Sequence, residues 1–115
     1  MANIIDLSYL EKVCEGDTEF MKEMIEAFIE TIPENLTEMQ NAHNAADWPL
    51  LARIVHKMKP SIAFMGIEEL KANVLELETL AKEGKKPAEI KTLVAKVDST
   101  TTQAIAELSE LLKTF

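Results

Sequence analysis

The sequence predicts an all-α fold, an antiparallel four-helix bundle with a short additional helix at its N-terminus. Leu, Ala, Glu, Lys and Met, which are strong helix formers, dominate the 115 residues. Only three glycines and four prolines are present, which leaves little room for strands and tight turns. Apolar residues recur at three- and four-residue steps in long segments with short connections, a pattern typical of helices packed side by side.

Composition and charge narrow the classes of function. With 47 % hydrophobic residues the chain can bury a core, and we expect residues 1–115 to form one domain. The net charge of −8 argues against nucleic acid and anionic membranes as partners. No apolar run approaches the ~20 residues of a membrane helix, and no signal peptide is visible. We therefore expect a cytoplasmic protein, in which the lone Cys14 is a small core residue.

The first half of the chain predicts two helices before residue 47. Asp6 is the expected N-cap of a short helix over residues 7–13, with apolar positions at Leu7, Leu10 and Val13. Asp17 or Thr18 caps a second helix, which persists to about residue 46. Its wide apolar face consists of Phe20, Met21, Met24, Ile25, Phe28, Ile29 and Ile32. Pro33 either starts a new helix at its first turn or kinks one long helix.

Two more helices are expected after residue 66. One runs over about residues 67–82 and ends before Gly84. Pro87 opens the last helix, whose apolar stripe extends to Phe115. Residues 99–102, Ser-Thr-Thr-Thr, are poor helix formers, and we expect a weak or bent point there.

Residues 47–66 are expected to form the central helix, around which the rest of the chain is organised. Asp47 is its expected N-cap, Pro49 suits the first turn, and Gly66 ends it. One face is apolar and consists of Leu51, Val55, Met58, Ile62 and Met65. At about 100° per residue, His56 lies roughly 140° from the middle of that face. We therefore expect His56 to be exposed, together with its neighbour Lys57.

The surroundings of His56 are basic. Lys59 lies three residues further along the same side of the helix, and Arg53 and Lys57 add positive charge to a chain that is acidic overall. An ammonium one turn from an imidazole could stabilise a phosphate placed on a ring nitrogen. The competing interpretation is an ordinary surface histidine, and these features alone do not decide between the two.

Other chemistries have less support. His43 is in step with Leu36 and Met39 and has no basic neighbour, so we expect a packed or half-buried structural histidine. The absence of HExxH, CxxC and paired Glu-x-x-His motifs argues against a metal site. Ser61 lies five residues after His56, but nothing marks an oxyanion hole. No glycine-rich phosphate loop is present, so we expect neither ATP binding nor kinase activity.

Residues 52–66 resemble the signature of histidine-containing phosphotransfer (HPt) domains of bacterial two-component phosphorelays. In that family a His is followed by two residues, a Lys, a Gly and a Ser, with another Gly ten residues after the His. The chain has His56, Lys59 and Ser61 at these spacings, and Gly66 is in place. The resemblance extends over nearly the whole chain, through Asp6-Leu7-Ser8-Tyr9-Leu10, Gly16-Asp17, Asp47-Trp48 and Leu77-Glu78.

The resemblance implies a phosphocarrier that is not itself a kinase. His56 matches the phosphoacceptor, Lys59 the lysine that supports the phosphoryl group, and Glu78 a polar position close to the histidine. The implied partners are response-regulator receiver domains and a hybrid sensor kinase. The receiver would supply the acidic pocket and Mg²⁺, so we expect this chain to have no cofactor of its own. We also expect a monomer. The expected docking face consists of Ala52, Arg53, Lys57, Lys59, Pro60 and Ala63.

Pro60 departs from the family pattern, which usually has Gly at this position. Glycine lets the backbone and phosphate of a partner approach closely. Proline is larger, and it removes the amide that would bond to the carbonyl of His56, so we expect the helix to bend there. This departure motivates an alternative, a helical module that binds receivers without carrying phosphate. A helical adaptor unrelated to signalling is a third hypothesis.

Overall fold

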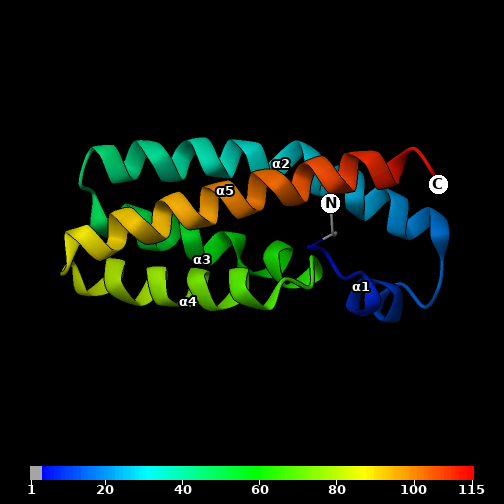
Figure 1. The fold of residues 1–115 in the computed structure, drawn as a ribbon, viewed down its shortest axis with the longest axis horizontal. Coiled ribbons are helices and arrows are strands. Elements are labelled where there is room, and N and C mark those ends of the chain that lie inside the picture. The colour runs from blue at the N-terminus through cyan, green and yellow to red at the C-terminus, as the bar shows by residue number, and fades with distance from the viewer. Residues whose placement is uncertain (1–3) are drawn as a thin grey trace.

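The chain folds into helices joined by short turns over residues 4–115, the part that this computed structural model describes (Figure 1). In order, the elements are α1 (Ser8–Val13), α2 (Thr18–Asn44), α3 (Trp48–Phe64), α4 (Glu68–Glu83) and α5 (Pro87–Leu112). Asp17 and Asp47 cap α2 and α3 as predicted, because their carboxylates accept hydrogen bonds from the amides of Phe20 and Leu50. Gly84 ends α4 in the left-handed region, with φ of 66°.

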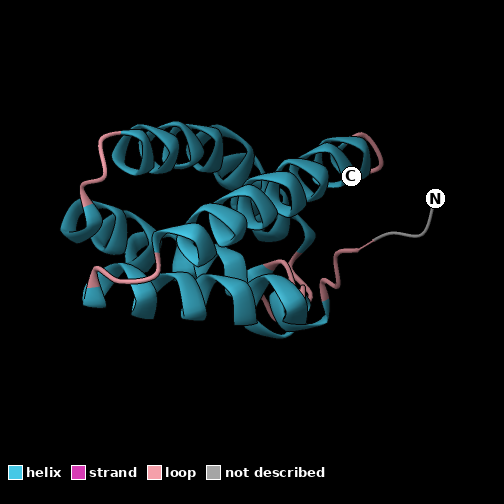
Figure 2. Ribbon diagram, turned by 60° about the vertical axis from the view of Figure 1, so that its left-hand side comes forward, coloured by secondary structure: helices cyan, strands magenta, loops and turns pink. Residues whose placement is uncertain are grey.

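The four longer helices form the bundle. α3 contacts both α2 and α4, and α5 contacts the same two helices from the other side. Each helix therefore packs against its neighbour in sequence, and the loops lie at the ends of the bundle (Figure 2). The short α1 lies at the end of the bundle where α3 stops and α4 starts (Figure 1). The predicted all-helical bundle with a short first helix is confirmed.

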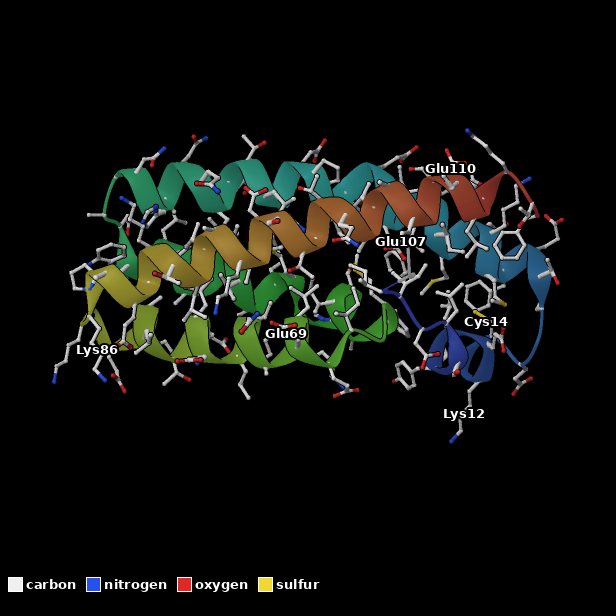
Figure 3. The ribbon with its side chains drawn as sticks, in the orientation of Figure 1. Lys12, Cys14, Glu69, Lys86, Glu107 and Glu110 are labelled. Carbon is white, nitrogen blue, oxygen red and sulfur yellow. The ribbon has the colours of Figure 1, made fainter. Side chains whose placement is uncertain are left out.

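The core is apolar and runs between the four long helices. The stripe predicted on α3 is buried: Leu51, Val55 and Met58 are 0 % exposed and Ile62 is 1 % exposed. Cys14 is also buried, between α1 and the bundle, as its sequence context predicted (Figure 3). None of the helices in residues 4–115 has the length and hydropathy needed to span a bilayer.

Several predicted helix limits and buried positions were wrong. α1 starts at Ser8 rather than Leu7, although the Asp6 carboxylate still accepts a hydrogen bond from the Ser8 amide at 2.9 Å. α2 stops at Asn44, and Ala46 adopts a positive φ in the turn beyond it. Apolar side chains at the helix ends are exposed because the bundle does not extend over them. These side chains are Val13, Phe20 and, beyond the end of α5, Phe115.

Helix is continuous through two segments where an irregularity was expected. α2 continues through Pro33, so the second of the two alternatives, one long helix, is correct. α5 continues through residues 99–102, where a weak point was predicted. Thr101 in this run is completely buried, so packing against the neighbouring helices outweighs the poor helix propensity of the segment.

The segment before α1 is hydrogen-bonded to the bundle at two places. The amide of Asp6 donates to the carbonyl of Met65 at 2.9 Å. The amide of Ile4 donates to the carboxylate of Glu107 at 2.8 Å. Glu107 is on α5 and is labelled in Figure 3. Gly66 lies where the segment crosses the end of α3, with φ of 69°. A Cβ atom at Gly66 would overlap the carbonyl oxygen of Asp6.

Substitution of Gly66 tests this close approach. Gly66→Ala should lower the free energy of unfolding by more than Gly16→Ala, measured by urea denaturation. Both glycines have positive φ, so both variants bear the left-handed strain of roughly 1–2 kcal/mol. Only at Gly66 does the added methyl group meet backbone, whereas nothing lies within 4 Å at Gly16. Equal losses in the two variants would show that the Asp6 segment moves aside freely.

Candidate functional site

His56 lies in the middle of α3 and points away from the core. Burial of the Leu51, Val55 and Met58 side chains fixes the rotation of the helix about its axis. The opposite surface of α3 therefore faces outward, and the His56 side chain is 65 % exposed. The neighbouring Lys57 side chain is 58 % exposed. The predicted exposure of both residues is confirmed.

Glu78 of α4 binds several basic groups around His56. Its Oε2 atom lies 2.6 Å from Nδ1 of His56, and its Oε1 atom accepts a hydrogen bond from Nζ of Lys59 at 2.9 Å. Nζ of Lys82 lies 3.7 Å from Oε2. The Glu78 side chain is only 5 % exposed, so this carboxylate is held in the seam between α3 and α4. The three residues expected from the sequence, His56, Lys59 and Glu78, are therefore brought together.

The charge of Glu78 follows from its neighbours. Burial raises the pKa of this carboxyl group, but the hydrogen bonds from Lys59 and His56 and the charges of Lys59 and Lys82 outweigh that effect. The pKa is therefore below its ordinary value of 4.5, and Glu78 is a carboxylate at neutral pH.

The carboxylate in turn selects the tautomer of His56. A carboxylate only accepts hydrogen bonds, so the 2.6 Å contact requires the proton of the neutral imidazole to be on Nδ1. The lone pair then belongs to Nε2, at the other side of the exposed ring. This arrangement presents a nucleophilic nitrogen to whatever approaches α3 from solvent.

Lys82 is a site residue that the sequence analysis missed. It lies four residues after Glu78 on α4, and pairs of opposite charge at this spacing are neighbours on a helix. That spacing could have identified it once Glu78 had been assigned to the site. Lys82, Arg53 and His56 border a surface hollow of about 460 Å³. The Glu78 carboxylate, which pairs with Lys82, also lines the hollow, so Arg53 gives the lining a small net positive charge.

The expected docking face needs one correction. Ala52 is buried, at 5 % exposure, because it lies on the edge of α3 that turns toward α4. It contributes to the lining of the hollow beside His56 rather than to an open surface. Pro60 is exposed and Ala63 is half-buried. Lys57 leans toward α2, where its Nζ lies 3.4 Å from Oε1 of Glu38.

The other candidate residues lie away from this site. His43 is half-buried on α2, as its pattern predicted, and its ring centroid is 6.1 Å from that of Trp48. Within residues 4–115, no three His, Cys, Asp or Glu side chains are grouped so as to hold a metal ion. The basic cluster of His56, Lys59 and Lys82 around Glu78 is the candidate functional site.

Comparisons with known proteins identify a matching family and two solved structures with a similar fold. The family described as Hpt domain matches residues 23–114. The fold is similar to histidine-containing phosphotransfer protein B (HptB) from Pseudomonas aeruginosa PAO1, with a TM-score of 0.86 and 19 % identity over 100 % of this chain and 99 % of that chain. It is also similar to the HPT domain of a sensor hybrid histidine kinase from Shewanella, with a TM-score of 0.84 and 13 % identity over 97 % and 96 % of the two chains. No curated protein matches the sequence.

The lowered pKa of Glu78 predicts a specific pH dependence. Because the carboxyl group binds its proton less tightly in the folded state, its stabilising contribution is complete above about pH 4.5 and is lost as the pH falls through the folded-state pKa. Glu78→Gln should therefore show a smaller loss of unfolding free energy between pH 5 and pH 3 than the unmodified protein, measured by urea denaturation. Glu76→Gln, an exposed change on the same helix, is the matched control and should leave the slope unchanged. A Glu78→Gln profile parallel to that of the unmodified protein would contradict the assigned ion pairs.

Proposed function

The chain belongs to the Hpt domain family, and from this premise we propose that Nε2 of His56 carries the phosphoryl group. As an Hpt domain, the protein functions in histidine phosphotransfer within a two-component phosphorelay. The observation that carries the assignment is the exposed His56 ring whose Nδ1 contacts the buried Glu78 carboxylate. His43, half-buried and without a carboxylate partner in the described residues, offers no comparable nucleophile.

The proposed transfer begins from an aspartyl phosphate on a receiver domain. The Nε2 lone pair attacks the phosphorus, the Nε2–P bond forms, and the P–O bond to the aspartate breaks, so that the aspartate leaves as a carboxylate. The imidazole, which keeps its proton on Nδ1, becomes positively charged as the bond forms. The carboxylate of Glu78, 2.6 Å from Nδ1, stabilises that charge where it develops. Reversal of the same steps passes the phosphoryl group to a second receiver.

Lys59 is proposed to support the phosphoryl group. Its Nζ neutralises Glu78 in the unphosphorylated protein, at 2.9 Å from Oε1. A phosphoryl group adds a charge of roughly −1.5 to −2 and strong acceptor oxygens beside the ring. The Lys59 side chain is 37 % exposed, so its ammonium group is accessible to a phosphoryl group on His56. Lys82, which is 65 % exposed, remains near Oε2 of Glu78 and helps to keep this carboxylate ionised.

The proposed context is that of a carrier between two-component proteins. Its partners are receiver domains, one of them on a hybrid sensor kinase, and the receiver supplies Mg²⁺ for both transfers. The chain acts as a cytoplasmic monomer without a cofactor or kinase activity of its own. A receiver-binding module that carries no phosphate is not favoured, because the match to the Hpt domain family extends over the whole of α3 and α4.

Phosphate transfer from a receiver tests the assignment of His56. After incubation with a receiver domain phosphorylated by acetyl phosphate, the protein should gain an acid-labile, base-stable phosphate. His56→Gln should abolish this gain and lower the unfolding free energy by at most about 1–3 kcal/mol, because the buried Glu78 carboxylate loses one hydrogen-bond partner. His43→Gln is the matched control, with full phosphotransfer and some loss of stability. If both variants kept full phosphotransfer, the assignment of His56 would be wrong.

The two lysines that flank His56 should have different effects. Lys59→Ala should slow transfer and shorten the lifetime of the phosphorylated protein by about tenfold or more, because a hydrogen bond to a charged group contributes roughly 1.5–3 kcal/mol. Lys57 leans toward α2 and away from the Glu78 cluster. Lys57→Ala should therefore mainly weaken receiver binding, in a salt-dependent way. Lifetimes are measured without receiver present, and equal shortening in both variants would contradict this division of roles.

A further inference from the structure

A row of exposed or half-buried apolar side chains leads from His56 to the short helix α1. Pro60 and Phe64 follow His56 at four-residue steps along the surface of α3. The ring of Phe64 stacks on that of Tyr9, with centroids 5.3 Å apart. Tyr9 is 50 % exposed, and Val13, one turn further along α1, is 42 % exposed. We call Pro60, Phe64, Tyr9 and Val13 the Tyr9 strip.

The ring of Tyr9 is packed against other aromatic rings although the residue is 50 % exposed. It stacks on Phe64, which in turn stacks on the buried Phe28 of α2 with centroids 5.8 Å apart. The segment before α1 is bonded to the end of α3 through Asp6 and Met65. An exposed aromatic ring that is already ordered loses little conformational freedom when a partner covers it. Such rings are frequent among the residues that dominate binding energy.

The size of a protein interface brings the Tyr9 strip within reach of the partner. Transfer requires the receiver to touch His56, and a typical specific interface covers about 800 Å² on each partner, equivalent to a disc of roughly 16 Å radius. Phe64 lies eight residues after His56, which is about 12 Å along the helix axis. A footprint centred on the His56 ring therefore extends to Phe64 and to the edge of Tyr9.

We propose that the Tyr9 strip is the apolar part of the receiver-docking surface, with Tyr9 as its anchor, so that α1 exists to present this ring beside the phosphotransfer site. The proposal rests on the assignment of His56 as the phosphoacceptor. It assigns Tyr9 to recognition and not to chemistry, because the ring lies beyond Phe64, too far along α3 to touch the reacting atoms.

A second exposed apolar surface near His56 offers the receiver an alternative docking surface to the Tyr9 strip. Leu75 on α4 is 57 % exposed and borders a hollow between α3 and α4 that Lys59 also lines. It resembles Tyr9 in exposure and in being close to the site. A receiver that extended over α4 instead of α1 would bury Leu75 and leave Tyr9 in solvent. Leu75→Ala is therefore the matched control for Tyr9→Ala.

The test measures transfer rate against the concentration of a receiver domain that exchanges phosphate with the unmodified protein and is phosphorylated with acetyl phosphate. Tyr9→Ala should raise the half-saturating receiver concentration at least tenfold and leave the rate at saturation unchanged. Leu75→Ala should leave both quantities unchanged, and Tyr9→Phe should restore tight binding. An unchanged half-saturating concentration for Tyr9→Ala, or a rise for Leu75→Ala alone, would overturn the proposal.

Two further measurements separate docking from folding and from chemistry. Val13→Glu lies in the strip but outside the aromatic stack, so it should weaken receiver binding even if Tyr9→Ala loosens α1. The lifetime of phosphorylated His56 without receiver should be the same in all strip variants, and a shortened lifetime would show that Tyr9 acts on the chemistry instead. Failure of the underlying assignment is distinguishable, because the unmodified protein would then accept no phosphate from any receiver.

Discussion

The buried carboxylate of Glu78 is the constraint on which the site depends. Removal of a carboxylate from water costs several kcal/mol unless partners compensate for the lost hydration. Here His56 and Lys59 from α3 and Lys82 from α4 provide that compensation. The interaction joins two helices, so it ties their relative rotation and register to the geometry of the His56 ring. The same contact that satisfies a buried charge therefore holds the ring in one tautomer and orientation.

The amphipathic pattern of α3 makes this arrangement possible. Its buried stripe can only face the core if the helix has one rotation, and that rotation exposes His56. A shift of one residue would turn the imidazole about 100° around the helix axis and remove it from Glu78. Apolar packing thus sets the coarse position of the ring, and the hydrogen bond to Glu78 sets the fine position. The proposed phosphotransfer site needs both, because the packing alone leaves the ring free to rotate.

Features that lie within one helix were the ones that the sequence could predict. The stripe of α3, its Asp47 cap and the exposure of His56 all follow from spacing along a single element. Glu78 was found only through the family resemblance, because the contact between α3 and α4 depends on how two helices meet, which periodicity does not encode. Ala52 was misplaced for the same reason, since α4 covers an edge of α3 that appears open when the helix is considered alone.

Proline inside a helix removes one hydrogen bond and crowds the carbonyl four residues earlier, a cost of roughly 3 kcal/mol. Both internal prolines of this protein, Pro33 and Pro60, are exposed, and His56, four residues before Pro60, is exposed as well. The carbonyl of His56 loses its amide partner at an exposed position, where solvent can replace it and the larger penalty of a buried unpaired group is avoided. Met58 and Ile62, on either side of Pro60, remain packed in the core and keep α3 on its path. The bundle thus accommodates a ring where its family usually has glycine, and that ring becomes part of the surface a partner must fit.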